Sequence, residues 1–224
     1  LGLQGIPVSA ELLILERDLT LLEYNNCRYH ISQISSASSV EIIRERKNKV
    51  NFSCGVSINN LSLNENDIGD FKTFLKLSPP LRTEDDRNAL VQGLADETID
   101  VIVSDHKPED EENKRLTFAQ AETGASGIET LLPLSLELYH NGSVNLETII
   151  KALTSSPAKI LKINKGNLSI GNDADFCIVD INKPWVVRKE KLISKSKNTP
   201  IEDKKLQGKV MNTFVNGEEL FKAE

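Results

Sequence analysis

The sequence predicts an α/β fold with a parallel sheet, followed by a small all-β module. Within residues 1–165, apolar β-branched runs alternate with helical patterns of about 10–15 residues, an order typical of parallel sheets. The run from Ile99 to Val103 is mostly apolar and ends in Ser104-Asp105-His106, as a buried strand does when it delivers a carboxylate. After residue 165 short β segments alternate with turn glycines. We therefore expect two units, residues 1–165 and residues 166–224.

Composition and charge restrict the classes of function. The chain has 224 residues, a formal net charge of −6 and 39% hydrophobic residues, which suit one large or two modest globular domains. The acidic balance argues against nucleic-acid and anionic-membrane partners, and no apolar run approaches the ~20 residues of a membrane span. Cys27, Cys54 and Cys177 are widely spaced and odd in number. They indicate a reducing compartment, for which we expect the cytoplasm, and neither a disulfide framework nor a cysteine zinc site.

The first residues read as the middle of a loop. The run from Leu1 to Pro7 has no Met, no basic segment and no apolar core of a signal peptide. We expect a longer protein, of which this chain is a fragment.

The first elements follow from periodicity and capping. Residues 8–24 carry apolar side chains at helical spacing and are stopped by Asn25-Asn26. Residues 28–34 form the first expected strand. The serine-rich residues 35–38 then cap a helix over residues 39–47.

A second strand and a third helix lead to the strand before Asp105. Residues 50–58 form the second strand, and residues 59–76 are loop-like with one helical turn after Asn64. The adjacent prolines in residues 77–82 exclude regular structure there. Acidic residues after Thr83 start a helix that runs to about Leu94.

The rest of the first unit is helical. Residues 107–114 form a charged loop, and residues 123–127 form a glycine-bearing turn. Helices are expected over residues 128–139 and 145–153, and a short one with Pro157 in its first turn reaches Leu161. The β module that follows has about 60 residues and would be marginal alone, so we expect it to pair with strands elsewhere.

Asp105 is the first candidate for chemistry. In (β/α)8 barrels the C-terminal ends of the strands form the catalytic face, and Asp105 directly follows a predicted strand. The alternative is that Asp105 only caps the following loop or helix. From this stretch alone both interpretations stay open. His140, two residues before Gly142, is interpreted as a residue at a helix C-terminus.

Several motifs occur in a fixed order along nearly the whole chain. They are Gly-Ile-Pro-x-x-Ala-Glu at 5–11, Tyr-His-Ile-Ser-Gln-Ile-Ser-Ser at 29–36, Pro-Pro-Leu-Arg-x-x-x-Asp-Arg at 79–87, Thr-Ile-Asp-Val-Ile-x-Ser-Asp-His-x-Pro at 98–108, Gly-Ile-Glu-Thr-x-Leu-Pro-Leu at 127–134, Ser-Pro-Ala-Lys-Ile-Leu at 156–161, Gly-x-Asp-Ala-Asp at 171–175 and Ser-Lys-x-x-Asn-Thr-Pro at 194–200. In this order they resemble the C-terminal half of a class I dihydroorotase, in the amidohydrolase superfamily.

The resemblance implies a zinc-dependent (β/α)8 TIM-type barrel, of which this chain supplies the last strands and helices, with a small β-sandwich module at the C-terminus. Enzymes of this family interconvert carbamoyl-aspartate and dihydroorotate in pyrimidine biosynthesis. The other metal ligands of the family, including its His-x-His pair, would lie upstream of Leu1.

At the metal site, the resemblance places Asp105 at the aspartate that touches metal and acts as general base. Gln33 stands at the position of a metal-ligating His, and an amide is a poor substitute for imidazole on zinc. His30 is expected on the opposite strand face from Gln33, so it cannot replace that ligand. His106 should point away from the site for the same reason, and it is interpreted as a residue that packs or that supports a ligand, and not as a ligand itself.

At the substrate site, the resemblance implies further departures. Ser78 replaces an Asn that binds substrate, and Glu109 replaces a His that contacts the substrate carboxylate. The negative charge of Glu109 would repel an anionic substrate. Asn59-Asn60 stands where the family tends to have His-His. The substrate loop keeps Gly124, next to Thr123.

The sequence keeps the motifs of the family's scaffold, whereas most positions that bind metal or substrate in the family carry other residues. Three hypotheses follow. The first is a dihydroorotase-like protein with a degenerate metal and substrate site, which assembles as a homo-oligomer and is a structural partner of aspartate transcarbamoylase. The second is an active zinc-dependent dihydroorotase with a mononuclear or shifted metal site. The third is an amidohydrolase with an altered cyclic-amide substrate.

Overall fold

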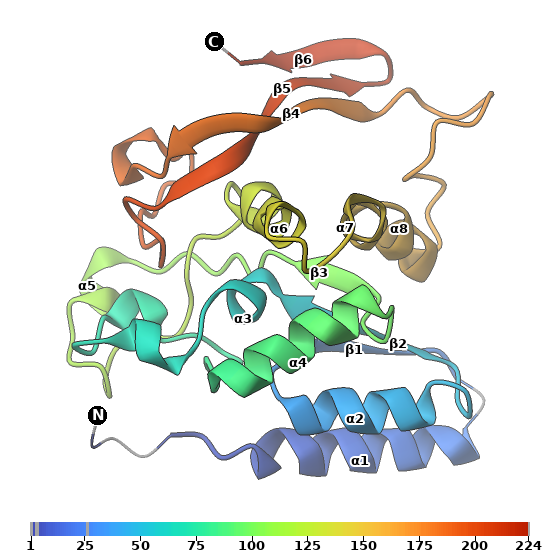
Figure 1. The fold of residues 1–224 in the computed structure, drawn as a ribbon, viewed down its shortest axis with the longest axis vertical. Coiled ribbons are helices and arrows are strands. Elements are labelled where there is room, and N and C mark those ends of the chain that lie inside the picture. The colour runs from blue at the N-terminus through green and yellow to red at the C-terminus, as the bar shows by residue number, and fades with distance from the viewer. Residues whose placement is uncertain (1, 3–4, 26, 224) are drawn as a thin grey trace.

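A parallel sheet organises the first unit of the chain (Figure 1). The computed structural model describes residues 2, 5–25 and 27–223. The sheet has the order β1-β2-β3, with β2 parallel to both neighbours. Its strands are β1 (Tyr29–Ile34), β2 (Phe52–Ser57) and β3 (Val101–Val103). The α/β class predicted from the sequence is confirmed. Among the described residues, the outer edges of β1 and β3 pair with no further strand.

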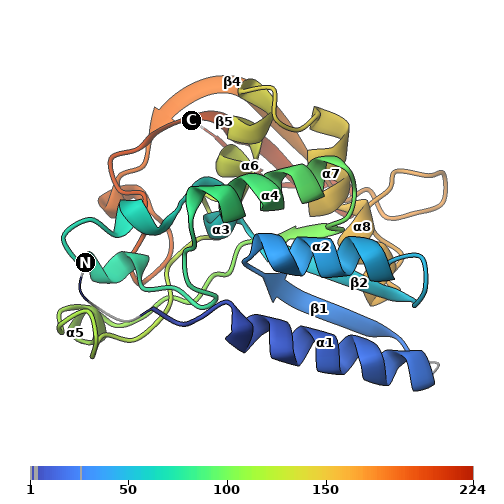
Figure 2. The same cartoon turned by 60° about the horizontal axis from the view of Figure 1, so that its bottom comes forward.

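Helices alternate with these strands and then follow them. In Figure 2, α1 and α2 run along the sheet beside β1 and β2, and α4 lies next to α2. Further along the chain, α7 packs against β3 and α6 packs against the C-terminal sheet. The α-helices are α1 (Ser9–Tyr24), α2 (Ala37–Arg46), α3 (Ile58–Ser62), α4 (Glu84–Ala95), α5 (Glu111–Lys114), α6 (Leu131–His140), α7 (Leu146–Leu153) and α8 (Ser155–Leu161).

Side-chain caps fix where the helices around the sheet begin. The Ser36 side chain accepts a hydrogen bond from the backbone N–H of Ser39 at the start of α2. Thr83 and Asp86 form a capping box at the start of α4, as the acidic run predicts. Asp86 also accepts from the backbone N–H of Ala37 at 2.8 Å, so one carboxylate holds the starts of α2 and α4 together.

Several boundaries differ from the sequence prediction. The second strand ends at Ser57, whose hydroxyl caps α3, so Ile58 lies in a helix and not in a strand. The loop expected after Asn59 therefore begins with α3, and two short 3-10 helices follow in it, η1 (Glu65–Ile68) and η2 (Thr73–Leu75). The helical turn predicted after Asn64 is confirmed by η1.

Two further boundaries shift around Asp105. Strand β3 begins two residues later than predicted, because the Ile99 N–H bonds to Gly93 O at the end of α4. Helix α6 begins at Leu131 and not at residue 128, since a turn with a Thr130 N–H to Gly127 O bond precedes it. His140 ends α6 as predicted.

The C-terminal module is an antiparallel sheet that packs on α6. It has the order β4-β5-β6, from β4 (Phe176–Val186), β5 (Lys205–Val215) and β6 (Glu218–Lys222), with the short η3 (Lys189–Lys191) between β4 and β5. Gly208 has a φ of +105°, and a side chain there would collide with Leu136 of α6. Among the described residues these strands pair only with one another, in one layer, so the predicted sandwich and pairing elsewhere stay predictions.

The hydrophobic core is continuous between the two sheets. One cluster of buried side chains includes Ile31 and Val56 of the parallel sheet, Leu134 of α6 and Leu206 of β5. No helix in the described part of the chain is long and apolar enough to cross a membrane. The three cysteines carry free thiols.

We expect Gly55→Ala to destabilise the parallel sheet. Gly55 lies opposite Val101 in β2, and a Cβ there would collide with the carbonyl oxygen of Ser32 and lie 3.0 Å from Val101 Cγ2. Overpacking of this kind costs about 1–3 kcal/mol of unfolding free energy. Urea denaturation of the full-length protein measures it. Gly5→Ala is the matched control, because a Cβ at Gly5 meets nothing within 4 Å. Equal stabilities of the two variants would contradict the close strand packing.

Candidate functional site

Asp105 and Gln33 meet at the C-terminal end of the parallel sheet. Gln33 is the penultimate residue of β1, and Asp105 follows β3 after one residue. The Gln33 Nε2 donates a hydrogen bond to Asp105 Oδ1 at 3.0 Å. The side chain of Asp105 is only 2% exposed. The two positions that the resemblance implied at a metal site are thus in direct contact.

A lysine joins this pair. Lys107 Nζ lies 3.3 Å from Asp105 Oδ1, and it donates to the backbone oxygen of Ser78 at 3.4 Å. Ser78 itself is exposed. Sequence reasoning did not select Lys107. The signal was a basic residue only two positions after the candidate carboxylate.

The backbone at Asp105 is left-handed. Its φ is +47°, a value that few non-glycine residues adopt and that Asp tolerates better than most. The extended chain therefore breaks at this residue and resumes at His106, which bridges to Ala125 in parallel. The Lys107 N–H continues this pairing by donating to Ala125 O at 2.9 Å. The turn at Asp105 brings the segment after β3 alongside the glycine-bearing loop.

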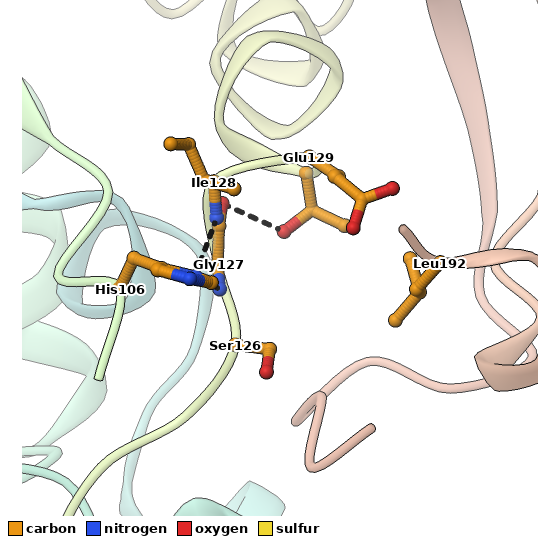
Figure 3. A pocket seen from close by; sticks show the side chains of 7 residues that line it. His106, Ser126, Gly127, Ile128, Glu129 and Leu192 are labelled. Carbon is orange, nitrogen blue, oxygen red and sulfur yellow. Dashed lines mark hydrogen bonds between the residues drawn. The ribbon is translucent and has the colours of Figure 1, made fainter. Parts of the chain in front are cut away.

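His106 has a packing role. Its Nδ1 accepts from the backbone N–H groups of Gly127 at 3.1 Å and Ile128 at 3.3 Å. Figure 3 shows the imidazole facing this backbone, in a small cavity lined also by Glu129 and Leu192. The Glu129 carboxylate in turn accepts from the backbone N–H groups of residues 193 and 194 at 2.9 Å each. His106 thus fixes the loop before α6, which agrees with its interpretation as a packing or supporting residue.

Asn198 ties the two loops beside Asp105 together. Its Nδ2 donates to Gly124 O at 3.1 Å, and its Oδ1 accepts from the Ser126 hydroxyl at 3.1 Å and the Glu109 N–H at 3.3 Å. Asn198 is 3% exposed. Sequence reasoning included it in a motif, Ser-Lys-x-x-Asn-Thr-Pro, but did not assign it a role at the site.

The other predicted substrate residues lie in these loops. Gly124 has a φ of +137°, and a Cβ there would lie 2.6 Å from Lys107 O, so the loop packs directly on the segment after Asp105. Glu109 is half-buried and held through its backbone by Asn198. Thr123 is half-buried, and its side chain makes no hydrogen bond within the part of the chain that the structure describes. Neither Glu109 nor Thr123 contacts Asp105 by a recorded polar bond among these residues. Their roles toward a substrate stay predictions.

His30 lies away from the Gln33–Asp105 pair. Its Nδ1 is 2.8 Å from the Ser53 hydroxyl of β2, and burial lowers its pKa below the ordinary value. Nearby, Asp100 accepts from the Cys54 N–H at 2.8 Å and pairs with Lys47 at 2.9 Å. These polar residues lie near the starts of the three strands, at the opposite end of the sheet from Asp105. His30 therefore does not supply a ligand in place of Gln33.

These residues do not fit a zinc ion. Gln33 directs its amide nitrogen, a donor, toward Asp105, and Lys107 brings an ammonium to the same oxygen. Zinc requires lone-pair donors such as imidazole, thiolate or carboxylate. Across residues 5–25 and 27–223, no three His, Cys, Asp or Glu side chains gather to hold a metal ion.

Lys114 is a buried cation at the rim of the site. Its Nζ donates to Thr73 O at 3.2 Å and to Glu122 O at 2.6 Å, and the residue is 2% exposed. Burial lowers its pKa to about 8, while the charge of Glu109 acts in the opposite direction. Lys114 thereby links η2 to the residue that precedes the glycine-bearing turn.

Comparison with known proteins gives one consistent family. Residues 6–220 match the amidohydrolase family. A dihydroorotase from Ehrlichia canis is 42% identical over 225 residues, which cover 100% of this chain and 50% of that protein. A dihydroorotase from Acetivibrio thermocellus is 41% identical over 219 residues, which cover 97% of this chain and 51% of that protein. The chain spans about half the length of these relatives.

Solved structures agree on the fold. The L-hydantoinase (dihydropyrimidinase) from Arthrobacter aurescens superposes with a TM-score of 0.92 at 27% identity, over 96% of this chain and 49% of that chain. The dihydropyrimidinase from Brevibacillus agri NCHU1002 superposes with a TM-score of 0.90 at 22% identity, over 96% and 49%. The second likeness concerns the fold alone.

We expect Lys114→Met to change how stability depends on pH. Because the folded pKa of about 8 lies below the ordinary 10.5, the unfolded chain holds more protons than the folded one between these values. Wild-type stability relative to the variant therefore rises as the pH increases from about 8 to about 10. Urea denaturation of the full-length protein across this range measures it. Lys49→Met, at an exposed lysine, controls for the loss of one charge. A stability difference between the wild type and Lys114→Met that stays constant or falls as the pH rises would contradict the burial of the Lys114 ammonium.

Proposed function

The chain belongs to the amidohydrolase family, and on that premise we propose that it is part of a dihydroorotase-like protein of pyrimidine biosynthesis whose metal position beside Asp105 is degenerate. The observation that carries the proposal is the 3.0 Å hydrogen bond from Gln33 Nε2 to Asp105 Oδ1. A carboxylate that shared a zinc site with an imidazole would instead have a metal ion as its partner at this point.

The chemistry of the partners supports a site without catalytic zinc. A buried carboxylate needs a compensating charge or hydrogen bonds, and Asp105 receives both from Lys107 and Gln33. An amide oxygen is a weaker zinc ligand than an imidazole nitrogen, so Gln33 is a poor replacement for a ligating His. The protein itself thus satisfies the charge that a metal ion would otherwise neutralise.

The substrate side supports the same proposal. By the resemblance, Glu109 stands where the family binds the substrate carboxylate and Ser78 stands where it has an Asn. The negative charge of Glu109 would oppose binding of an anion such as carbamoyl-aspartate or dihydroorotate. We propose that these positions no longer bind that substrate.

We further propose a structural role for the protein, as a homo-oligomer beside aspartate transcarbamoylase in the cytoplasm. The support is the resemblance, because some family members of this kind hold that enzyme in an assembled complex. The free thiols agree with a reducing compartment. The remaining strands of a (β/α)8 barrel, and the second layer of a β-sandwich, would come from the rest of the protein.

Active zinc-dependent dihydroorotase is the alternative function. It is favoured by the retained Asp105, whose side chain is 2% exposed at the end of β3, and by relatives at about 40% identity that are named dihydroorotase. Upstream ligands would then bind zinc without Gln33. An amidohydrolase with an altered cyclic-amide substrate is a further alternative, favoured by the likeness to an L-hydantoinase at 27% identity.

We expect the full-length protein to carry well under one zinc ion per chain and to form no dihydroorotate from carbamoyl-aspartate. The reason is the amide and ammonium at Asp105 in place of metal ligands. Metal analysis of the purified protein and a direct assay of dihydroorotate measure the two quantities. Stoichiometric zinc together with turnover would refute the degenerate site.

The alternative function makes its own prediction. If Asp105 is a general base, Asp105→Asn lowers turnover by about 10²–10⁴-fold. Asp70→Asn, at an exposed acid, is the matched control and should leave turnover unchanged. Wild-type turnover in the Asp105→Asn protein would remove this alternative.

A further inference from the structure

We infer that Lys107 is a built-in counter-cation for Asp105, and that its ammonium keeps divalent metal ions away from this carboxylate. The inference rests on the proposed function, because it names the group that replaces the metal charge. It concerns a residue that the sequence motifs did not single out.

The geometry directs the Lys107 ammonium at one oxygen. Lys107 Nζ lies 3.3 Å from Asp105 Oδ1, the same oxygen that accepts from Gln33 at 3.0 Å. A second acceptor, Ser78 O at 3.4 Å, lies within reach of the same ammonium. The two donors therefore converge on one oxygen of the carboxylate that the resemblance assigns to the metal site.

The backbone of Lys107 is fixed, which aims its side chain. The Lys107 N–H donates to Ala125 O at 2.9 Å, and Gly124 packs against the Lys107 carbonyl so closely that a Cβ there would lie 2.6 Å from it. The left-handed turn at Asp105 lies two residues earlier. The Lys107 side chain therefore starts from a fixed point in the backbone, two residues from Asp105.

The two partners of the ion pair differ in how exposed their side chains are. The Asp105 side chain is 2% exposed, whereas that of Lys107 is 52% exposed. The ion pairs recorded among the described residues give Asp105 one partner, Lys107. A buried carboxylate requires such a partner, and a divalent ion at the same oxygen would be strongly repelled by an ammonium at this distance.

The test is a zinc titration of the full-length protein. Calorimetry with ZnCl2 compares wild type, Gln33→His, Lys107→Met and the double variant Gln33→His/Lys107→Met. We expect the double variant to bind zinc at least about tenfold more tightly than Gln33→His alone, because only the double variant has both a ligating imidazole and no ammonium.

Three controls isolate the charge. Gln33→His/Lys107→Arg keeps a cation and should gain no zinc affinity over Gln33→His. Gln33→His/Lys107→Gln removes the charge but keeps a donor for Ser78 O, so it should gain affinity even if the Met variant folds poorly. Lys72→Met in the Gln33→His background removes an exposed lysine and should change nothing.

The outcomes separate this inference from the proposed function. Equal zinc affinities of Gln33→His, its Lys107→Gln form and its Lys107→Arg form would overturn the role of Lys107. Stoichiometric zinc and turnover in the wild type would overturn the degenerate site. The gain in zinc affinity on removal of the ammonium is measured separately from the zinc content and turnover of the wild type. A gain seen only in the variants with a neutral residue at position 107 supports Lys107 as the counter-cation.

Discussion

The burial of one carboxylate determines how the end of the parallel sheet is arranged. The Asp105 side chain is 2% exposed at the end of β3, where an ionised group without partners would be strongly destabilising. An amide from β1 and an ammonium two residues further along the chain meet the same oxygen. The left-handed backbone at Asp105 makes this convergence possible, because it turns the chain where a continuing strand would have led away.

The loops around this carboxylate are held by side chains that bond to backbone atoms. His106, Lys114 and Asn198 each contact two or more backbone groups of the glycine-bearing loop or of the segments beside it. Asn198 comes from the connection between β4 and β5, so the C-terminal module helps to shape the end of the parallel sheet. The two units predicted from the sequence are therefore coupled at the site as well as through the core.

Much of this arrangement could be predicted from the sequence, because periodicity and capping are local. Periodicity and capping predicted the order of strands and helices, and the resemblance implied the neighbouring placement of Gln33 and Asp105. The contribution of Asn198 depends on a contact with Gly124, 74 residues away, which no local pattern encodes. Lys107 was missed because the positive φ at Asp105 interrupts the simple alternation of side chains. Helix α3 was missed because Asn59-Asn60 suggested a polar loop, whereas both residues are buried.

Within the described part of the chain, the outer edges of β1 and β3 pair with no further strand, which also affects how this polypeptide behaves by itself. Each edge presents backbone donors and acceptors that can template pairing with another molecule. On α1, which packs against β1, Leu13 is 68% exposed and Tyr24 is 82% exposed. They add exposed apolar surface to this part of the molecule. These edges and exposed side chains together would favour association between copies of this polypeptide.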